Sequence, residues 1–471
     1  MAGAILSGCS LTVREAPREL DLEVPAGWTA EDRQRQAPAA AEPEERWWES
    51  FGAAPLNGLV AEALENNHDL AAAAQRLRQA QAQARIAGAD LSPQVSAGFD
   101  ASRARRNFIG FPIPGGGESV LSTTSSSLGV SLNVSWEADL WGRLRAGRDA
   151  AAADREAARW DLEGARLSLA GQTAKAWFAL AEARQQVDLA EKTVESRRQT
   201  QEKIQRRYEL GLRGALDLRL ATSNRASAEA TLAARHRQED AARRQLEVLL
   251  GRYPGGELEA PPALPPPPGP IKAGLPAELV ARRPDLKAAD RRLAGAGARV
   301  AQARGTLYPA LRLTGSGGRT SEELGDLLSG DFSVWSLAAG LLQPIFQGGR
   351  LRAGVDLAAA AADEALARYA QAVLQAFSEV ETSLAGEGFL RRQEAALERA
   401  VREAVAAQAT AEQRYSSGLA DYLEVLESQR QAFLLESQLL EVRRLRLASR
   451  VDLHLALGGG FSSPPDPRTS S

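Results

Sequence analysis

The feature that most constrains this chain is an internal duplication. The hexapeptide that begins at Gly142 recurs unchanged at Gly349, an offset of 207 residues. At the same offset, Tyr208-x-x-Gly211-Leu212 is repeated as Tyr415-x-x-Gly418-Leu419. Solenoid repeats have periods of about 20 to 50 residues, so a period of roughly 200 residues is too long for that architecture. The chain must instead fold as two related halves.

The offsets also delimit the two halves. Upstream of the hexapeptide the offset changes to 216 residues, because Asp69-Leu70 matches Asp285-Leu286. We therefore expect repeat 1 at 56–251 and repeat 2 at 276–458. The segment between them, 252–275, is rich in proline, and such a connector is extended and fairly stiff.

Long stretches without proline predict the helices of each half. Proline is absent from 115 to 253 and from 345 to 463. Within these stretches, runs of 67 residues beginning at 143 and 350 consist mainly of strong helix formers. Each run would make about 100 Å of helix, and each then meets a glycine, a common helix terminator. We expect helical hairpins at 143–250, with its tip near 211, and at 350–457, with its tip near 418.

Alternating residues predict two strands in each half. From Leu128 to Trp136 every second residue is apolar, and Trp335 to Leu341 repeats the pattern. A period of two is the signature of a strand with two different faces. We expect strands of about 9 to 11 residues, the length of tilted membrane-spanning strands. Their expected places are about 93–106, 126–138, 309–320 and 331–343. The alternative is a small solvent-facing sheet on a soluble domain.

Four strands impose a physical condition if they cross a bilayer. No run of eighteen apolar residues exists, so no helix is expected to span one. The smallest membrane barrels have about eight strands, and an open sheet edge in lipid leaves backbone groups without partners. Strands that span a membrane here would therefore require several copies of the chain to pool them.

Charge and motif content exclude several classes of protein. The chain has 57 Lys+Arg against 60 Asp+Glu, a formal net charge of −3, whereas nucleic-acid binders show a basic excess. One cysteine cannot build a disulfide framework or a cysteine-rich metal site. His68, His236 and His454 have no ligand spacing, and neither a P-loop nor an HExxH motif is present. We expect no catalytic residues, no metal and no cofactor, so an enzyme is not expected.

The single cysteine lies near the start of the sequence. Leu6-Ser7-Gly8-Cys9 follows a short apolar run and resembles the end of a bacterial lipoprotein signal, where the cysteine is lipidated. The alternative is a buried thiol, since a free cysteine packs as a small hydrophobic side chain. We expect 1–8 to be the remnant of a lipoprotein signal and Cys9 to carry lipid. Ser10 is similar to the pattern of lipoproteins sent to the outer membrane.

Several short motifs span nearly the whole chain. They are Trp47-Trp48-x-x-Phe51 with Pro55-Leu56, Asp139-Leu140-Trp141-Gly142-Arg143, Arg282-Arg283-Pro284-Asp285-Leu286, Leu307-Tyr308-Pro309, Pro344-Ile345-Phe346 with Gly348-Gly349-Arg350, and Tyr415-x-x-Gly418-Leu419. Together they resemble the TolC-like outer-membrane factors of tripartite efflux systems. The resemblance is to the lipidated branch that is associated with resistance–nodulation–division pumps.

The resemblance implies a fold class. It is mainly α with transmembrane β: duplicated coiled-coil hairpins and four strands per subunit. Three subunits pool their strands in a trimeric twelve-stranded outer-membrane barrel on an α-helical periplasmic tunnel. An equatorial belt would hold the lipidated N-terminal segment 9–55, the connector 252–275 and the C-terminal tail 459–471.

The resemblance also implies a function. The protein would be a homotrimeric outer-membrane channel of a Gram-negative bacterium, a passive exit duct for drugs or other small toxic compounds. Its partners would be a periplasmic adaptor (membrane fusion protein), an inner-membrane resistance–nodulation–division pump and outer-membrane lipid, with no nucleic acid. One alternative is a duct for type I protein secretion. The other is a periplasmic coiled-coil adaptor without a barrel, but such an adaptor would carry one hairpin rather than two.

By the same resemblance, the tunnel closes at its periplasmic end near the helical tips. The residues that match the gate are Asp217, Leu423, Glu424 and Glu427, and Asp421, which lies close by, is included with them. Stacked carboxylates in a narrow pore repel anions, attract cations and raise one another's pKa. The alternative is that they are ordinary surface acids on charged helices.

The tips are also the expected docking surface for the adaptor. The residues that form the turns there are Tyr208, Gly211, Leu212, Tyr415, Gly418 and Leu419.

Overall fold

The computed structural model describes residues 28–29, 46–108, 121–269 and 276–459. Cys9, the signal remnant 1–8 and the tail beyond 459 therefore lie outside the described residues, as does most of the segment 9–55. The expectations for these parts of the chain stay predictions.

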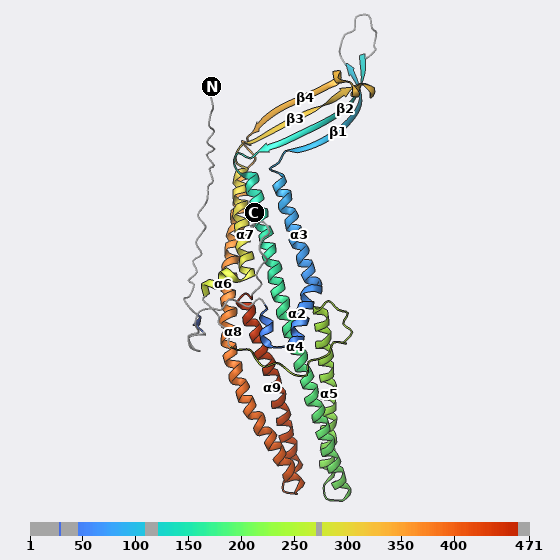
Figure 1. Cartoon of the computed structure of the whole chain (residues 1–471), viewed down its shortest axis with the longest axis vertical. Coiled ribbons are helices and arrows are strands. Elements are labelled where there is room, and N and C mark those ends of the chain that lie inside the picture. The colour runs from blue at the N-terminus through green and yellow to red at the C-terminus, as the bar shows by residue number, and fades with distance from the viewer. Residues whose placement is uncertain (1–27, 30–45, 109–120, 270–275, 460–471) are drawn as a thin grey trace. The chain divides into compact units, whose positions relative to one another are not determined.

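Helices dominate the described chain, and the expected mainly α chain with duplicated hairpins and four strands is confirmed (Figure 1). The elements are η1 (Trp47–Phe51), α2 (Ala54–Asn66), α3 (His68–Ala89), β1 (Gln94–Phe108), β2 (Leu121–Ala138), α4 (Arg143–Glu209), α5 (Ala215–Leu249), α6 (Pro276–Arg282), α7 (Pro284–Gly305), β3 (Ala310–Ser321), η2 (Gly325–Leu328), η3 (Gly330–Phe332), β4 (Ser333–Leu342), α8 (Arg350–Ser416) and α9 (Tyr422–Ala456). Among the described residues, no helix carries an apolar stretch long enough to cross a membrane.

The described residues form two compact units. The sheet unit comprises Arg78–Ala157 and Asp290–Arg368, and it holds all four strands. The hairpin unit comprises Asp21–Leu77, Ala158–Ala289 and Tyr369–Ser471, as far as these ranges are described. It contains the turns of both long hairpins, α4–α5 and α8–α9.

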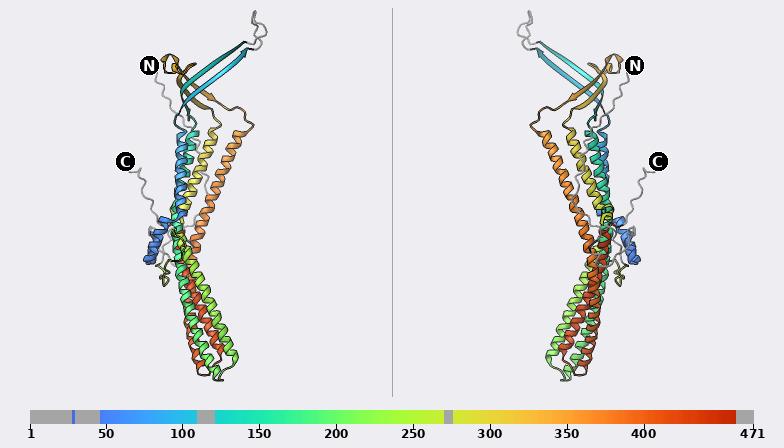
Figure 2. Two further views of the ribbon diagram at one scale, coloured as in Figure 1. Left: turned by 90° about the vertical axis from the view of Figure 1, so that its right-hand side faces the viewer. Right: turned by 90° about the vertical axis from the view of Figure 1, so that its left-hand side faces the viewer.

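The four strands form one antiparallel sheet in the order β1-β2-β3-β4 (Figures 1 and 2). Side chains alternate between the two faces of a sheet, and the register aligns residues of one kind across the strands. One face, the apolar face, carries Val95, Ala97, Phe99, Leu128, Val130, Leu132, Val134, Trp136, Leu311, Leu313, Trp335, Leu337 and Leu341. The other, the polar face, carries Ser96, Asp100, Ser102, Ser131, Asn133, Ser135, Arg312, Thr314, Ser316 and Ser336.

The second strand is longer than the sequence pattern indicates. β2 has 18 residues and begins five residues before the expected 126–138, whereas β1, with 15 residues, lies close to the expected 93–106. The extension of β2 is a Ser/Thr-rich stretch, 121–127, which has no apolar alternation and therefore gave no signal. It pairs residue by residue with 102–108 of β1, so the ladder continues beyond the apolar part of the sheet.

Aromatic side chains fix the junctions between strands and helices in the sheet unit. Trp141 Nε1 donates to the Pro309 carbonyl at 2.7 Å, and its ring stacks on Tyr308 with centroids 5.1 Å apart. Trp136 Nε1 donates to the Leu91 carbonyl at 2.9 Å. The motif that contains Trp141 and the motif that contains Tyr308 and Pro309 are thus in contact. This contact joins the start of α4 to the start of β3.

The largest core of the hairpin unit is built around the Trp-Trp-x-x-Phe motif. The rings of η1 pack against apolar side chains of α4, α5 and α9. The fully buried members include Trp47, Phe51, Leu56, Val60, Phe178, Leu180, Leu246 and Leu250. A short aromatic segment therefore joins helices from both halves of the duplication.

Both halves end with the same backbone motif. Gly251 follows α5 and Gly458 follows α9, at φ of +73° and +90°. Each occupies the left-handed region, where glycine is favoured at helix ends. A Cβ at Gly251 would lie 2.5 Å from the Asn66 carbonyl oxygen, and one at Gly458 would lie 3.3 Å from Arg283 Cα. The close approach excludes a side chain at Gly251, and at Gly458 the left-handed backbone together with a tight contact favours glycine.

The helix starts that face these glycines are secured by different side chains. Asn67 Oδ1 accepts from the amides of Asp69 and Leu70, and its Nδ2 donates to the Leu249 carbonyl at 3.0 Å. In the second half, Arg283 Nη1 donates to the Ala456 carbonyl at 3.1 Å. The pairs are related by the offsets of the duplication, 216 and 207 residues. Both halves therefore have a hydrogen bond from the start of one helix to the end of another. The donor is the Asn67 amide in the first half and the Arg283 guanidinium in the second.

Candidate functional site

The turns of the two long hairpins lie at the same end of the hairpin unit and have matching geometry (Figures 1 and 2). In the first turn, the Leu212 amide donates to the Arg207 carbonyl at 2.8 Å, and the equivalent bond from Leu419 to Arg414 is 2.9 Å. These bonds run back across six residues, the pattern that closes a helix with a left-handed glycine. Gly211 and Gly418 supply that conformation, at φ of +70° and +77°.

Two tyrosines hold the turns together from inside. Tyr415 and Tyr422 are 6% and 2% exposed, and their ring centroids lie 5.9 Å apart. They pack with Ile204 and Ala221 of the first hairpin and with Val425. The cluster contains residues of both hairpins, so the tips share one small core.

Two arginines of the first hairpin surround Tyr415. The guanidinium carbons of Arg207 and Arg213 lie 5.4 and 4.8 Å from its ring centroid, within the range of cation–π attraction. Arg207 also donates to the carbonyls of Tyr415 and Ser416, at 3.1 and 2.6 Å. These carbonyls belong to the last turn of α8, where helix geometry leaves acceptors free and a positive charge is favourable.

Asp217 lies in the first turn of α5 and is half-buried. Burial raises the pKa of Tyr415, and the Asp217 carboxylate adds to this rise, while Arg213 and Arg207 oppose it. Burial likewise raises the pKa of Tyr422, with a further contribution from Asp217. Asp217 is thus the expected gate residue that lies at the tip cluster itself.

The acids of α9 are placed differently. Asp421, Glu424 and Glu427 are exposed, at the start of the helix. Glu427 pairs with Arg430 at 2.7 Å, and this hydrogen bond lowers the pKa of the carboxyl. Within one chain the pKa of Glu427 therefore moves opposite to the rise expected for stacked carboxylates, because its nearest charged neighbour is an arginine.

The remaining gate position is apolar and open. Leu423 is 60% exposed and lies two residues after Asp421, which occupies the N-cap position of α9 without a side-chain capping bond. The exposed set Leu423, Glu424 and Glu427 covers one side of the first turns of α9, while Tyr422 and Val425 face the cluster. The helix therefore separates a packing side from a side that is free to meet another copy of the chain.

The expected docking residues divide in the same way. Tyr208, Leu212 and Leu419 are 42, 68 and 72% exposed. Tyr415, in contrast, is 6% exposed and lies beneath Arg207 and Arg213. Its side chain points from the last turn of α8 into the shared cluster, where it packs rather than meeting solvent.

Sequence reasoning missed the arginines of this site. Arg207, Arg213 and Arg430 each contact one of the expected site residues or its backbone. The spacing of Glu427 and Arg430, three residues apart on a helix, was a usable signal. Arg207 and Arg213 contact the other hairpin, about 200 residues farther along the sequence, so no local sequence pattern predicts these contacts. In the described part of the chain, no group of three or more His, Cys, Asp or Glu is placed to hold a metal ion.

Comparison with known proteins gives a consistent result. A family model described as outer membrane efflux protein matches residues 59–252 and 275–459. The pyoverdine export outer membrane protein OpmQ of Pseudomonas putida is 35% identical over 461 residues, which cover 95% of this chain and 94% of that protein. The toluene efflux pump outer membrane protein TtgF of Pseudomonas putida is 32% identical, covering 97% of this chain and 95% of that protein.

A solved structure extends the likeness to the fold. The open state of the MtrE outer membrane channel of Neisseria gonorrhoeae superimposes with a TM-score of 0.81 at 28% identity. The match covers 96% of this chain and 98% of that one. The two blocks of the family match coincide closely with the two halves of the duplication, so the likeness extends over both.

Proposed function

The chain belongs to the outer membrane efflux protein family, and from this premise we propose that three copies pool their strands in one twelve-stranded barrel. The protein is an outer membrane channel of an efflux system. The sheet of a single chain is open at β1 and β4. In lipid, unpaired backbone groups at such edges are not tolerated. Pairing β4 of each copy with β1 of the next removes every edge.

The two faces of the sheet support this arrangement. In a membrane barrel the outward face is apolar and the interior is polar. The apolar face contains side chains that a single chain leaves in solvent, such as Trp335, Leu337 and Leu341, at 82, 81 and 68% exposed. Contact with lipid would remove this surface from water. The serines and Asn133 of the polar face would line the lumen.

We place the gate at the exposed side of the hairpin tips. Around a threefold axis, Asp421, Leu423, Glu424 and Glu427 of each copy would form rings, with Asp217 of the first hairpin beside them. A ring of Leu423 would narrow the pore, and rings of carboxylates would favour cations. The arginine next to Glu427 would limit how far its pKa rises when three copies meet.

The hairpin tips are also the proposed binding site for a partner protein. We propose that a periplasmic adaptor binds the tips through exposed apolar residues of the turns, chiefly Leu212 and Leu419, and connects the channel to an inner-membrane resistance–nodulation–division pump. The cargo would be drugs or other small toxic compounds, since the relatives include a toluene efflux protein. Energy would come from the pump, because the duct itself is passive.

The lipid anchor is a separate proposal, and it concerns Cys9, which lies outside the described residues. We expect Cys9→Ala to fold and to form trimers, because the pooled strands supply most of the apolar surface that meets lipid. The variant would be extracted from membranes more readily, and mass spectrometry would show the loss of the acyl groups. Failure of the variant to form trimers would show that the anchor is needed for assembly.

The observation that best supports a shared trimeric barrel is a four-stranded sheet with two open edges and an exposed apolar face. The test is the native mass of the protein extracted in mild detergent. We expect three times the chain mass of 50.3 kDa, in a complex that resists SDS until it is heated. A monomer that is soluble without detergent would refute the shared barrel.

A further inference from the structure

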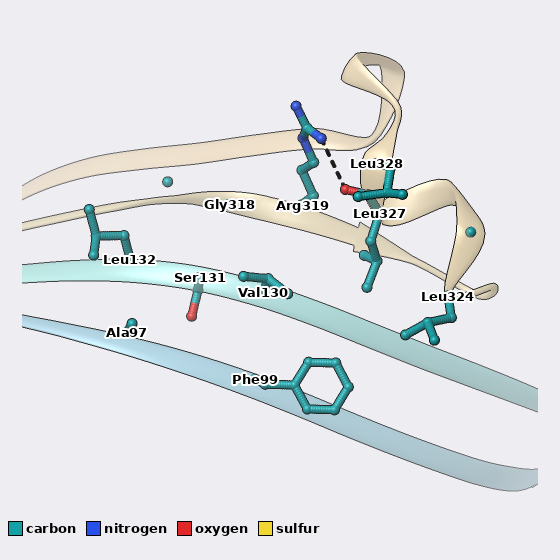
Figure 3. A pocket seen from close by; sticks show the side chains of 12 residues that line it. Ala97, Phe99, Val130, Ser131, Leu132, Gly318, Arg319, Leu324, Leu327 and Leu328 are labelled. Carbon is teal, nitrogen blue, oxygen red and sulfur yellow. Dashed lines mark hydrogen bonds between the residues drawn. The ribbon is translucent and has the colours of Figure 1, made fainter.

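The apolar face of the sheet contains a groove near the outer end of the strands. Its volume is about 900 Å³, and it lies entirely within the sheet unit (Figure 3). Its floor comes from β1, β2 and β3, and its rim from the loop between β3 and β4. Phe99, Val130 and Leu132 line the floor, and Leu324, Leu327 and Leu328 form the rim.

The rim is held in place although two of its leucines face outward. Leu324 and Leu328 are 65 and 86% exposed, whereas Leu327 is buried. Arg319 Nη1 donates to the Leu327 carbonyl at 3.0 Å, and the Ser321 hydroxyl donates to Asp326 at 2.8 Å. Fixing a loop so that it presents leucines to solvent costs free energy in water. In lipid the same arrangement is favourable.

The register of the strands locates the groove relative to the membrane. On β2, the side chains of the apolar face end at Leu128, two residues beyond Val130. Beyond that point β1 and β2 continue as the ladder of polar residues described above. The groove therefore lies at the outer limit of the apolar face, which in the proposed barrel would meet the border between acyl chains and headgroups.

Basic side chains mark this limit on the same face. On β1, Arg103 and Arg105 follow Phe99 and Ala101 at intervals of two. Their side chains therefore lie on the same face of the sheet as Phe99, farther toward the outer end of the strand. Arg319 lies opposite Val130 on β3. Arg103 and Arg105 are exposed, and Arg105 donates to the Ser122 hydroxyl at 2.9 Å. Guanidinium groups bind phosphate oxygens through paired hydrogen bonds.

The acidic residues of this region lie in the loop after β3 or on the polar face of the sheet. Glu322 and Glu323 are exposed before the rim, and Asp326 is engaged by Ser321. Asp100 is on the polar face. The positive charge on the apolar face is thus confined to β1 and β3: Arg319 lines the groove, and Arg103 and Arg105 lie outward of it.

We propose that this groove binds an acyl chain of a phosphate-bearing glycolipid of the outer leaflet, lipid A, while Arg103, Arg105 and Arg319 contact its phosphates. The inference rests on the proposed barrel, because the apolar face must meet lipid. Two features select this occupant over a protein partner. The groove is continuous with the lipid-facing surface, and its basic border matches a phosphorylated headgroup. A bound glycolipid would also cover the exposed leucines of the rim.

The test is native mass spectrometry of the complex purified in mild detergent, with lipid A counted per trimer. Leu324→Asn combined with Leu328→Asn should reduce retained lipid A about tenfold, because burial of both leucines against an acyl chain is lost. Arg103→Gln combined with Arg319→Gln should reduce it similarly by removing phosphate contacts. Arg106→Gln is the matched control, since Arg106 lies on the same strand but on the opposite face.

The outcomes separate this inference from the proposed function. A wild-type sample without trimers would refute the barrel. Trimers in which both double variants retain as much lipid A as the control would refute the glycolipid site alone. Equal retention of added phosphatidylcholine would show a non-specific lipid contact and would also overturn the inference. The single variant Leu328→Asn alters a side chain that is 86% exposed, so it provides the same comparison if the double variant does not assemble.

Discussion

The Arg207 guanidinium in the first hairpin donates to the Ser416 carbonyl at the end of α8 in the second, at 2.6 Å. A second bond from the same side chain reaches the Tyr415 carbonyl. One arginine therefore links the two tips of a single chain and satisfies acceptors that the helix end leaves free. If the tips form the gate, this link must break or stretch when they separate.

We expect Arg207→Ala to favour the open state of the channel. A hydrogen bond from a charged group contributes about 1.5 to 3 kcal/mol, and each 1.4 kcal/mol shifts a two-state ratio about tenfold. The open fraction in planar lipid bilayers should therefore rise by about tenfold or more. Arg207→Lys, which keeps the charge but not the two-pronged contact, should lie between the variant and the wild type.

Arg206→Ala is the matched control, because Arg206 is the preceding residue and its side chain is exposed. Its single-channel record should resemble the wild type. Equal opening in both variants would mean that general loss of positive charge, rather than the link, controls the tips.

The acids of α9 should set the ion selectivity of the closed tip. We expect Glu424→Gln combined with Glu427→Gln to reduce the preference for cations over anions, since two rings of charge would be lost. Reversal potentials in a salt gradient measure this directly. Unchanged potentials and conductance would refute the gate assignment of both residues.

Arg430→Gln tests the role of the neighbouring arginine. Because Arg430 lowers the pKa of Glu427, its removal should shift the titration of Glu427 to higher pH. The loss of cation preference on acidification should then begin at a higher pH than in the wild type. Below the pKa of the carboxyl the two proteins should converge.

The duplication allowed much of the fold to be predicted from the sequence. Repeated motifs delimited the halves, and proline-free runs located α4 and α8 because helix formation depends on local composition. The apolar–polar alternation of β2 predicted a strand only where one face is apolar. Its Ser/Thr-rich extension has no such alternation and was therefore not predicted. Contacts between hairpins, such as that of Arg207, were invisible because they join residues 209 positions apart.

The equivalent hydrogen bonds at the helix starts, from Asn67 and from Arg283, have different surroundings in the two halves. Asn67 and Arg283 occupy equivalent positions, yet only the arginine also binds carboxylates, those of Asp285 and Glu379. Arg283 is 8% exposed, and burying a charge is costly unless it is paired. The sequence motif that contains it therefore has a structural role in this chain.

We expect Arg283→Ala to destabilise the hairpin unit by roughly 2 to 4 kcal/mol, since it leaves a buried carbonyl and two carboxylates without their partner. The melting temperature of the complex in detergent should fall. Arg291→Ala is the control, because that arginine forms an exposed pair with the adjacent Asp290. Surface pairs contribute about 0 to 1 kcal/mol, so equal losses in the two variants would contradict the structural role of Arg283.

The ring of His454 stacks on Trp47, with centroids 5.0 Å apart, and Phe51 lies beside both. Its Nε2 is buried and has no hydrogen-bond partner among the described residues. Burial lowers the pKa of His454 to about 4, with a further contribution from the positive charge of Arg450. The neutral ring is therefore the form that fits the folded protein.

This arrangement predicts a loss of stability in mild acid. Between pH 6.5, the ordinary histidine pKa, and the folded pKa of about 4, only the unfolded state takes up the proton. Stability from this group is thus complete above pH 6.5 and declines as the pH falls toward 4. The shift corresponds to about 3 kcal/mol at most. We expect His454→Phe, which keeps the stacking surface, to flatten the melting temperature between pH 7 and pH 4 relative to the wild type.

His236→Phe is the control for this measurement, because that histidine is exposed on α5. Its profile should follow the wild type. If His454→Phe kept the full acid-induced decline, other groups would carry it, and the stacked pair would serve packing alone. If the decline disappeared only in this variant, a single buried ring between η1 and α9 would limit how acidic a medium the hairpin unit tolerates.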